Sequence, residues 1–383
     1  MVESRDYKGS LPKLHGYLSD HESSEKMVSI YVEPSPVYIE DWRDSNRLNF
    51  DFTLTGLTDK RLVIRFIKAA VYDEQDQLVT FRHLNHNAVG VSGIETVGKY
   101  EIAGQETVDL FNPFHSYPKT VPLHKLRYMF TFQDPETGKE YYYGNTVIHP
   151  TAYHQKVELT IPVKGLVTIL DGHDYYSHHR RFAMNQVRNI TNNTFRSNFS
   201  RYSIDLTHIG PDGNTRKMTP KEYKDNYDFH YTDITKFYTH KAPVYAPATG
   251  EIVEVVDTLP DLYETRFDFD QAISQNKVKD LAGNYIVIKH NESEYSHLFH
   301  LLKDSIEVSV GDHVSTGQMI AKIGFSGAST TYSHLHYQLL DGADFLRANA
   351  LPCRFSDVCL LNGKKSIRYE QTCIDTGDII FQE

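Results

Sequence analysis

The sequence predicts a mostly β protein built from two domains. Three observations support this prediction. The 383 residues exceed what one small hydrophobic core usually organises. The 26 tyrosines and 20 phenylalanines are residue types that suit half-buried sheet positions. Short runs of apolar residues also recur along the chain and are separated by turn-forming residues, which is typical of strands joined by tight connections.

The N-terminal part favours an antiparallel, immunoglobulin-like β-sandwich over residues 27–165, whose role the sequence leaves open. Residues 1–26 are polar and are expected to form an arm. Alternation is clearest in the run 48–54, where Leu48, Phe50, Phe52 and Leu54 fall on one face. Seven or so short strands in this length are typical of a sandwich. Other strand-like runs are 28–32, 62–66, 68–72, 128–132 and 157–161.

Residues 166–383 continue the β pattern after a boundary at Pro162–Gly165. The runs 284–290 and 294–300 are separated by a short turn and are expected to pair as a hairpin. Two stretches, 209–242 and 257–282, are charged and aromatic with weak periodicity. They are predicted to be insertions made of loops or small helices, which often border a site. The residues after Asp341 form a C-terminal extension with at least one more strand.

Composition narrows the range of partners. A net charge of −10 argues against nucleic acid as a ligand, because nucleic-acid binding requires a basic excess. No apolar stretch is long enough to span a membrane. The first residues lack the apolar core of a signal peptide, which fits a cytoplasmic protein or a periplasmic or secreted one whose signal has been removed. Three cysteines, none in a Cys-x-x-Cys pair, predict neither a disulfide framework nor a cysteine-based zinc site.

The histidines carry the strongest functional signal. Twelve of the 20 lie between His173 and His336, and His334 and His336 are separated by one residue on a predicted strand. Side chains two residues apart on a strand point to the same face. Two imidazoles therefore converge on one spot, which suits a metal ion or a catalytic pair.

The segments around these histidines keep a characteristic order and spacing. They are residues 243–253, 283–290, 300–301, 308–318, 324–330 and 334–338. Together they resemble the lysostaphin-type (LytM-type) zinc metallopeptidase family over roughly residues 170–342. The resemblance implies an open antiparallel β-sheet with one zinc ion in a groove on it. It also implies that the metal is held by a His, an Asp and the second His of His-x-His.

By this resemblance His336 is a metal ligand and Asp205, in Tyr202-Ser203-Ile204-Asp205, is the acidic ligand. His334 and the histidine that heads His300-Leu301 take the catalytic positions. His297 is a neighbour of His300, but residues three apart on a strand face opposite sides, so only one can point into the groove.

The first histidine ligand is the open question. The family usually places it four residues before the Asp, where this chain has Arg201. A variant with the histidine further upstream fits residues 172–181, which favours His178 as the ligand, followed by His179 and then His173. A competing pair, His230 and Asp233, lies nearer to Pro243, but its spacing is one residue short.

The resemblance implies a zinc-dependent endopeptidase that hydrolyses peptide bonds in peptidoglycan stem or cross-bridge peptides. Two other functions remain to be distinguished from it. One is a catalytically impaired LytM-type module that recruits or activates cell-wall hydrolases. The other is a metallohydrolase that acts on something other than cell wall. Zinc content separates the enzyme from the impaired module.

Overall fold

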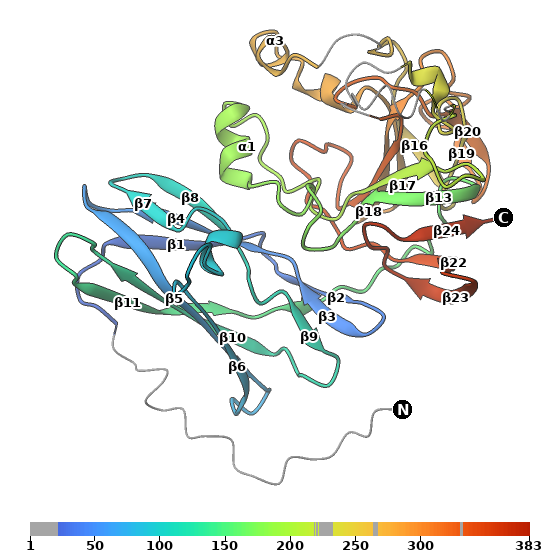
Figure 1. The fold of residues 1–383 in the computed structure, drawn as a ribbon. Coiled ribbons are helices and arrows are strands. Elements are labelled where there is room, and N and C mark those ends of the chain that lie inside the picture. The colour runs from blue at the N-terminus through green and yellow to red at the C-terminus, as the bar shows by residue number, and fades with distance from the viewer. Residues whose placement is uncertain (1–21, 218, 220, 222–232, 263–266, 330–331) are drawn as a thin grey trace. The chain divides into compact units, whose positions relative to one another are not determined.

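The computed structural model describes residues 22–217, 219, 221, 233–262, 267–329 and 332–383. The chain divides into two compact units (Figure 1). The first contains the described residues up to Val37 together with Phe50–Thr151, and the second contains Tyr38–Asn49 and Ala152–Glu383. The second unit therefore begins before the boundary expected at Pro162–Gly165 and also takes in a hairpin from the N-terminal third. Most of the expected arm over residues 1–26 lies outside the described residues.

The first unit consists of two antiparallel sheets. The smaller sheet has the order β1-β4-β8, and the larger has the order β11-β10-β5-β6, with β7 pairing β5. The strands are β1 (Val28–Glu33), β4 (Asp51–Gly56), β5 (Arg61–Tyr72), β6 (Leu78–Asn85), β7 (Glu101–Ala103), β8 (Thr107–Phe111), β10 (Lys125–Gln133) and β11 (Glu140–Ile148). A short strand β9 (Ser116–Pro118) and a 3₁₀ helix (Ile94–Thr96) complete the unit.

Aromatic side chains join these two sheets. The ring of Phe52 on β4 lies 4.9 Å from that of Tyr128 and 5.0 Å from that of Phe130 on β10, measured between centroids. All three side chains are buried. Face-to-face packing of two antiparallel sheets through alternating inward residues is compatible with the predicted sandwich.

The second unit is organised by a ten-stranded sheet in the order β19-β16-β17-β18-β21-β14-β13-β24-β22-β23. Every strand pairing described in it is antiparallel, so the protein is mostly β as predicted. The strands are β13 (Gly165–Asp171), β14 (Ile204–His208), β16 (Gly250–Val256), β17 (Asn284–Asn291), β18 (Glu294–Leu301), β19 (His313–Val314), β21 (Leu335–Leu340), β22 (Phe355–Asn362), β23 (Lys365–Thr372) and β24 (Ile379–Gln382). Strands β15 (Pro243–Tyr245) and β20 (Met319–Lys322) form a separate pair.

The helices of the second unit lie in the connections. They are α1 (Met184–Ile190), α3 (Phe269–Ser274) and the 3₁₀ helices η3 (Ile234–Lys236) and η4 (Val278–Ala282). The last three fall within the predicted insertions, although part of each insertion (218, 220 and 222–232 in the first, 263–266 in the second) lies outside the described residues. Among the residues described, no helix combines the length and apolar composition that crossing a membrane requires.

Strand β21 shows how the sheet positions its polar residues. Leu335, Tyr337 and Leu339 are fully buried in the main hydrophobic cluster of the second unit. Because side chains alternate along a strand, His336 and Gln338 must lie on the opposite face. Both are also buried, at 6% and 0% exposure, so this polar face is covered and excluded from bulk water.

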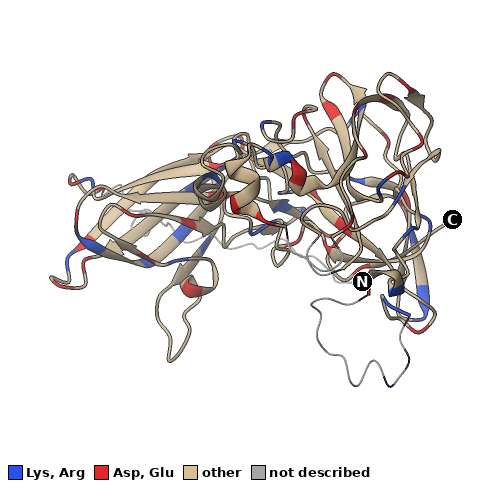
Figure 2. Ribbon diagram, turned by 90° about the horizontal axis from the view of Figure 1, so that it is seen from above, with Lys and Arg blue, Asp and Glu red and all other residues tan. Residues whose placement is uncertain are grey.

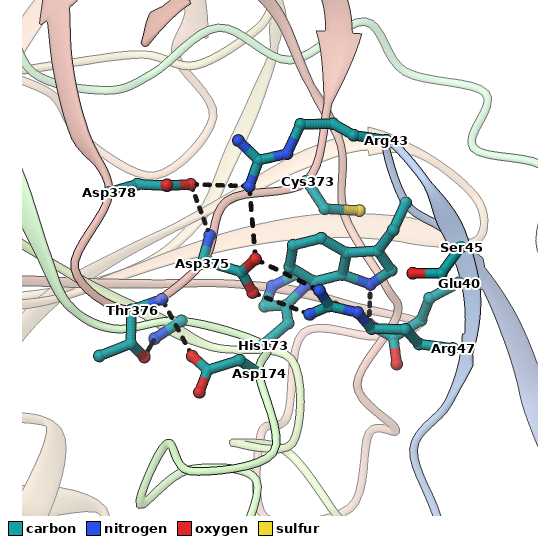
Figure 3. Close-up of polar contacts among 12 residues, drawn as sticks. Glu40, Arg43, Ser45, Arg47, His173, Asp174, Cys373, Asp375, Thr376 and Asp378 are labelled. Carbon is teal, nitrogen blue, oxygen red and sulfur yellow. Dashed lines mark hydrogen bonds and ion pairs between the residues drawn. The ribbon is translucent and has the colours of Figure 1, made fainter. Parts of the chain in front are cut away.

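The hairpin of β2 (Tyr38–Asp41) and β3 (Ser45–Leu48) is fixed to the C-terminal turn by ion pairs (Figure 3). Arg47 lies 2.8 Å from Asp375, and Arg43 lies 3.3 Å from Asp375 and 3.1 Å from Asp378. These half-buried pairs explain why residues 38–49 belong to the second unit.

Lysines and arginines are interspersed with acidic residues along both units (Figure 2). Because no single-sign region stands out among the described residues, buried polar groups are a better guide to a functional site than the distribution of surface charge.

The three cysteines are free thiols.

Candidate metal centre

Strand pairing brings the predicted ligands together. In the register of β14 and β21, Asp205 is the direct partner of His336. In the register of β18 and β21, Phe299 is the partner of His336, so His300 is one residue further along β18. The ring of Phe299 stacks on His336 with centroids 5.2 Å apart and planes 7° apart, which holds the imidazole in one orientation.

Asp205 is the centre of the cluster and is only 1% exposed. One carboxylate oxygen lies 3.0 Å from Nδ1 of His336 and 3.4 Å from Nε2 of His334. The other lies 3.6 Å from Nε2 of His179. Three imidazoles from distant parts of the sequence thus face one buried carboxylate.

The ring nitrogens of His336 and His334 that face away from Asp205 form hydrogen bonds of their own. Nε2 of His336 donates to Oε1 of Gln338 at 3.0 Å. Nδ1 of His334 donates to the carbonyl oxygen of Tyr332 at 3.0 Å. Their other nitrogens, Nδ1 of His336 and Nε2 of His334, face the carboxylate of Asp205. A neutral imidazole held in this way can present that nitrogen to a metal ion.

The donor set fits zinc. Zinc binds histidine nitrogen and carboxylate oxygen at about 2.0–2.2 Å, which places neighbouring ligand atoms about 3.3 Å apart in a tetrahedron. The distances to Asp205 of 3.6 Å from Nε2 of His179 and 3.0 Å from Nδ1 of His336 are close to this spacing. Nδ1 of His179 is buried and has no hydrogen-bond partner among the described residues.

Burial and neighbouring charges favour the protonation states in which these groups can bind a metal ion. Burial opposes ionisation of Asp205, but His334, His179 and His336 hold the pKa of its carboxyl well below the usual value. Burial lowers the pKa of His334 and lowers that of His179 well below the usual value. An ionised carboxylate and neutral imidazoles are the forms that bind a metal.

His300 and His334 form a second pair beside this cluster. Their ring centroids are 4.8 Å apart, and both side chains are buried. Nδ1 of His300 donates to the carbonyl oxygen of Ser326 at 2.9 Å, which leaves Nε2 as a free base. Burial, and then the neighbouring His334 and His336, lower the pKa of His300 well below the usual value.

His178 and His179 both lie with Asp205 in one group of possible metal-binding side chains, with ligand atoms within 4.8 Å of one another, but they differ in burial. His179 is 5% exposed, and its ring lies 4.8 Å from that of His336. The side chain of His178 is 61% exposed, and its Nδ1 lies 2.8 Å from Asp171. This hydrogen bond raises the pKa of His178 against the opposing effect of burial.

The remaining histidine candidates lie elsewhere. His173 belongs to a different buried cluster, with Nε2 3.7 Å from the thiol of Cys353. His297 bonds the carbonyl oxygen of Gly342 at 3.0 Å. Asp233 caps η3 through the backbone N–H of Thr235, and its proposed partner His230 lies outside the described residues.

Sequence reasoning missed three residues that support the centre. Gln338 could have been found, because it lies two residues after His336 on the same strand face. Asp171 and Tyr332 carry no such signal. The hydroxyl of Tyr332 lies 3.3 Å from Asp205 and 3.5 Å from Asp171, and only the fold reveals that it links the two carboxylates.

One comparison with known proteins concerns the C-terminal half of the chain. Residues 232–347 match the sequence model of peptidase family M23. The chain is similar to that family over this segment. The M23 segment carries His300, His334 and His336, whereas His179 and Asp205 come from residues upstream of it.

Several solved structures are similar to parts of the chain. LytU is 26% identical, with 29% of this chain and 61% of LytU covered and a TM-score of 0.21. The catalytic domain of lysostaphin from Staphylococcus simulans is 22% identical, with 32% and 81% covered and a TM-score of 0.21. A zinc containing peptidase from Vibrio cholerae is 16% identical, with 61% and 82% covered and a TM-score of 0.21. Among curated proteins, none matches the chain.

Proposed function

We propose that this protein is a zinc-dependent endopeptidase that hydrolyses peptide bonds, with peptidoglycan stem or cross-bridge peptides as its substrates. The observation that carries the proposal is the convergence of His179, His334 and His336 on the buried carboxylate of Asp205. The match of residues 232–347 to peptidase family M23 supports the reaction class. The substrate class is the one implied by the family resemblance.

In this proposal one zinc ion is held by His179, Asp205 and His336. His179 takes the place that the sequence assigned to His178, because His179 is buried beside Asp205 while His178 is largely exposed and paired with Asp171. Three protein ligands leave one coordination position open, which is the arrangement of catalytic rather than structural zinc sites.

The reaction needs a nucleophile, a base and an acid. When bound, zinc lowers the pKa of a water molecule to near neutrality and polarises the scissile carbonyl. His300 and His334 both donate Nδ1–H to a backbone carbonyl, so each presents Nε2 as a proton acceptor. One of them takes the proton of the attacking water and later returns it to the leaving amine. The other would take up a proton from solvent on Nε2 and would then donate a hydrogen bond to the oxyanion that develops on the carbonyl.

The complete set of ligands and bases supports an enzyme rather than the impaired regulatory module. Such a module would lack at least one ligand or one proton-transfer group. In this proposal His179, 26 residues before Asp205 in the sequence, takes the place of the histidine absent from position 201.

Two measurements test the proposal. Metal analysis of the purified protein should find one zinc per chain, and purified peptidoglycan should release free amino groups in its presence. His336→Ala should abolish both, while His300→Ala should abolish hydrolysis and keep the metal. Hydrolysis that persists in His336→Ala with no zinc bound would refute the proposal.

A matched pair of variants tests the ligand assignment. His179→Ala should lose zinc, whereas His178→Ala, at the adjacent position, should keep it. Loss of zinc in His178→Ala with retention in His179→Ala would reverse the assignment. Circular dichroism spectra that match the wild type serve as the control for folding of both variants.

A further inference from the structure

A cavity of about 210 Å³ lies where strand β2 meets the C-terminal extension. It is lined by residues 39–41 of β2, by residues 153–155 and by residues from Pro352 to Cys373 of the extension. All of these residues are described and belong to the second unit, and none of them takes part in the metal centre. The cavity is smaller than a site for a drug-sized ligand, so it suits a molecule of a few non-hydrogen atoms.

Glu40 brings a buried carboxylate with an unused acceptor to this cavity. The residue is 2% exposed and lies on β2, whereas Cys373, on another wall, follows β23 (Figure 3). Within the described part of the chain the carboxylate accepts one hydrogen bond, from Nε1 of Trp42 to Oε2 at 3.2 Å, and Oε1 accepts none. Because buried polar atoms are nearly always satisfied, an unused oxygen on a cavity wall indicates a donor from outside the chain.

The cationic side chains near Glu40 are paired with other carboxylates. Arg354, also on the cavity wall, has Nη1 3.0 Å from the carboxylate of Asp41. Arg47 has Nη1 2.8 Å from the carboxylate of Asp375. Burial raises the pKa of the Glu40 carboxyl to about 7, so the positive charges of the chain do not offset its loss of hydration. A cation bound in the cavity would supply this missing charge.

The other walls fit the rest of such a ligand. Ile39, Tyr153 and Pro352 offer an apolar surface on which an alkyl stem can pack. An ammonium group has three N–H donors, of which one can reach Oε1 of Glu40. The side-chain amide of Gln371 on the same cavity provides a carbonyl oxygen for a second donor.

We propose that this cavity binds a primary ammonium group on a short aliphatic stem, with Glu40 as its anionic partner. The site goes beyond the proposed peptidase function and is independent of it, because the two sites share no residue. A free alkylamine and the lysine-like side chain of a peptide both carry this chemistry.

The experiment compares three probes of similar size and different charge, namely n-propylammonium, propionamide and propionate. Binding is measured by ligand-observed saturation-transfer NMR at constant ionic strength. Trp42 fluorescence locates the binding, because the chain has one tryptophan and its indole N–H is bonded to Glu40. n-Propylammonium should bind with a Kd on the order of 1 mM, as expected for so small a ligand. Propionamide and propionate should bind at least about tenfold more weakly, because only the cation forms a charge-assisted bond with the carboxylate.

The test variant is Glu40→Gln, which keeps an acceptor for Trp42 and removes the charge. It should weaken n-propylammonium binding at least about tenfold. The matched control is Glu370→Gln, which removes an exposed carboxylate beside the wall residue Gln371 and should bind as the wild type does. Circular dichroism spectra that match the wild type confirm that both variants are folded.

A further arm distinguishes the two sources of the ammonium group. N-acetyl-lysine methylamide presents the same group on a peptide unit, so its binding alongside n-propylammonium assigns a peptide side chain, whereas binding of n-propylammonium alone assigns a free amine. Equal affinity for the three probes, no saturable binding of n-propylammonium, or undiminished binding in Glu40→Gln would each overturn the proposal. None of these results depends on hydrolysis or on zinc, so they leave the proposed function to its own tests.

Discussion

Replacing Glu40 by glutamine should change how the stability of the second unit depends on pH. Glu40 is 2% exposed and accepts a hydrogen bond from Nε1 of Trp42 at 3.2 Å (Figure 3). Burial raises the pKa of its carboxyl from 4.5 to about 7, with Trp42 and Arg47 opposing the rise. Nδ1 of the nearby His173 is 3.8 Å away, and burial lowers the pKa of that imidazole to about 4, so it supplies no compensating charge.

The sign and the size follow from proton linkage. Below pH 4.5 the carboxyl is protonated in both the folded and the unfolded chain, so it costs nothing. Between pH 4.5 and about 7 the unfolded chain loses this proton first, and the folded state is progressively destabilised. The full penalty at higher pH is roughly 3–4 kcal/mol, at about 1.4 kcal/mol for each pKa unit between 4.5 and about 7.

Glu40→Gln removes the titration and keeps an oxygen that can accept the bond from Trp42. The variant should be more stable than the wild type, and the difference in unfolding free energy between them should grow by about 2–3 kcal/mol from pH 5 to pH 8. Trp42 is the single tryptophan of the chain, so its fluorescence during urea unfolding reports on this unit. Glu370→Gln, at an exposed position, is the matched control. A difference between Glu40→Gln and wild type that does not vary with pH would refute the reasoning.

Three further substitutions test individual contacts within the second unit. Gln338→Met removes the acceptor for Nε2 of His336, and zinc affinity measured by chelator competition should fall about 10- to 100-fold. Glu294→Leu removes a buried carboxylate that accepts hydrogen bonds from the Tyr153 hydroxyl and the backbone N–H groups of Lys156 and Val157, so urea unfolding should show a loss of roughly 2–4 kcal/mol, and a loss below 1 kcal/mol would contradict this. Gly327→Ala places a methyl group 2.3 Å from the backbone nitrogen of Gly283 at a φ of +71°, so the loop must shift and move the Ser326 carbonyl that holds Nδ1 of His300; hydrolysis should therefore fall, and full activity would contradict this.

Much of the sheet could be predicted because alternation marks half-buried strands. The runs 28–32 and 284–290 correspond to β1 and β17. The runs 62–66 and 68–72 are one strand, β5, because Phe66, Ile67 and Lys68 continue the ladder with β6 and β10. The run 157–161 forms no strand. The backbone N–H of Val157 is taken by the carboxylate of Glu294, a side-chain contact that no local pattern encodes.

In the candidate metal centre, too, some residues could be predicted from local sequence and others depend on contacts that are distant in the sequence. His334 and His336 could be paired from sequence alone, because a period of two defines one face of a strand. The choice between His178 and His179 could not be made in this way. Both lie in a turn, and their directions depend on Asp171, which pairs with His178 and turns it outward, and on the buried space beside Asp205 that His179 fills.

The position of Asp205 shows that the candidate site extends beyond the segment that matches family M23. The M23 match begins at residue 232, yet β14, which carries Asp205, lies between β21 and β13 inside the ten-stranded sheet. Removing β14 would take away both a neighbour of the histidine strand and the carboxylate that the three imidazoles face. The proposed metal centre therefore depends on residues 165–208 as much as on the segment similar to family M23, because the strand that completes the sheet also carries Asp205, the proposed acidic ligand.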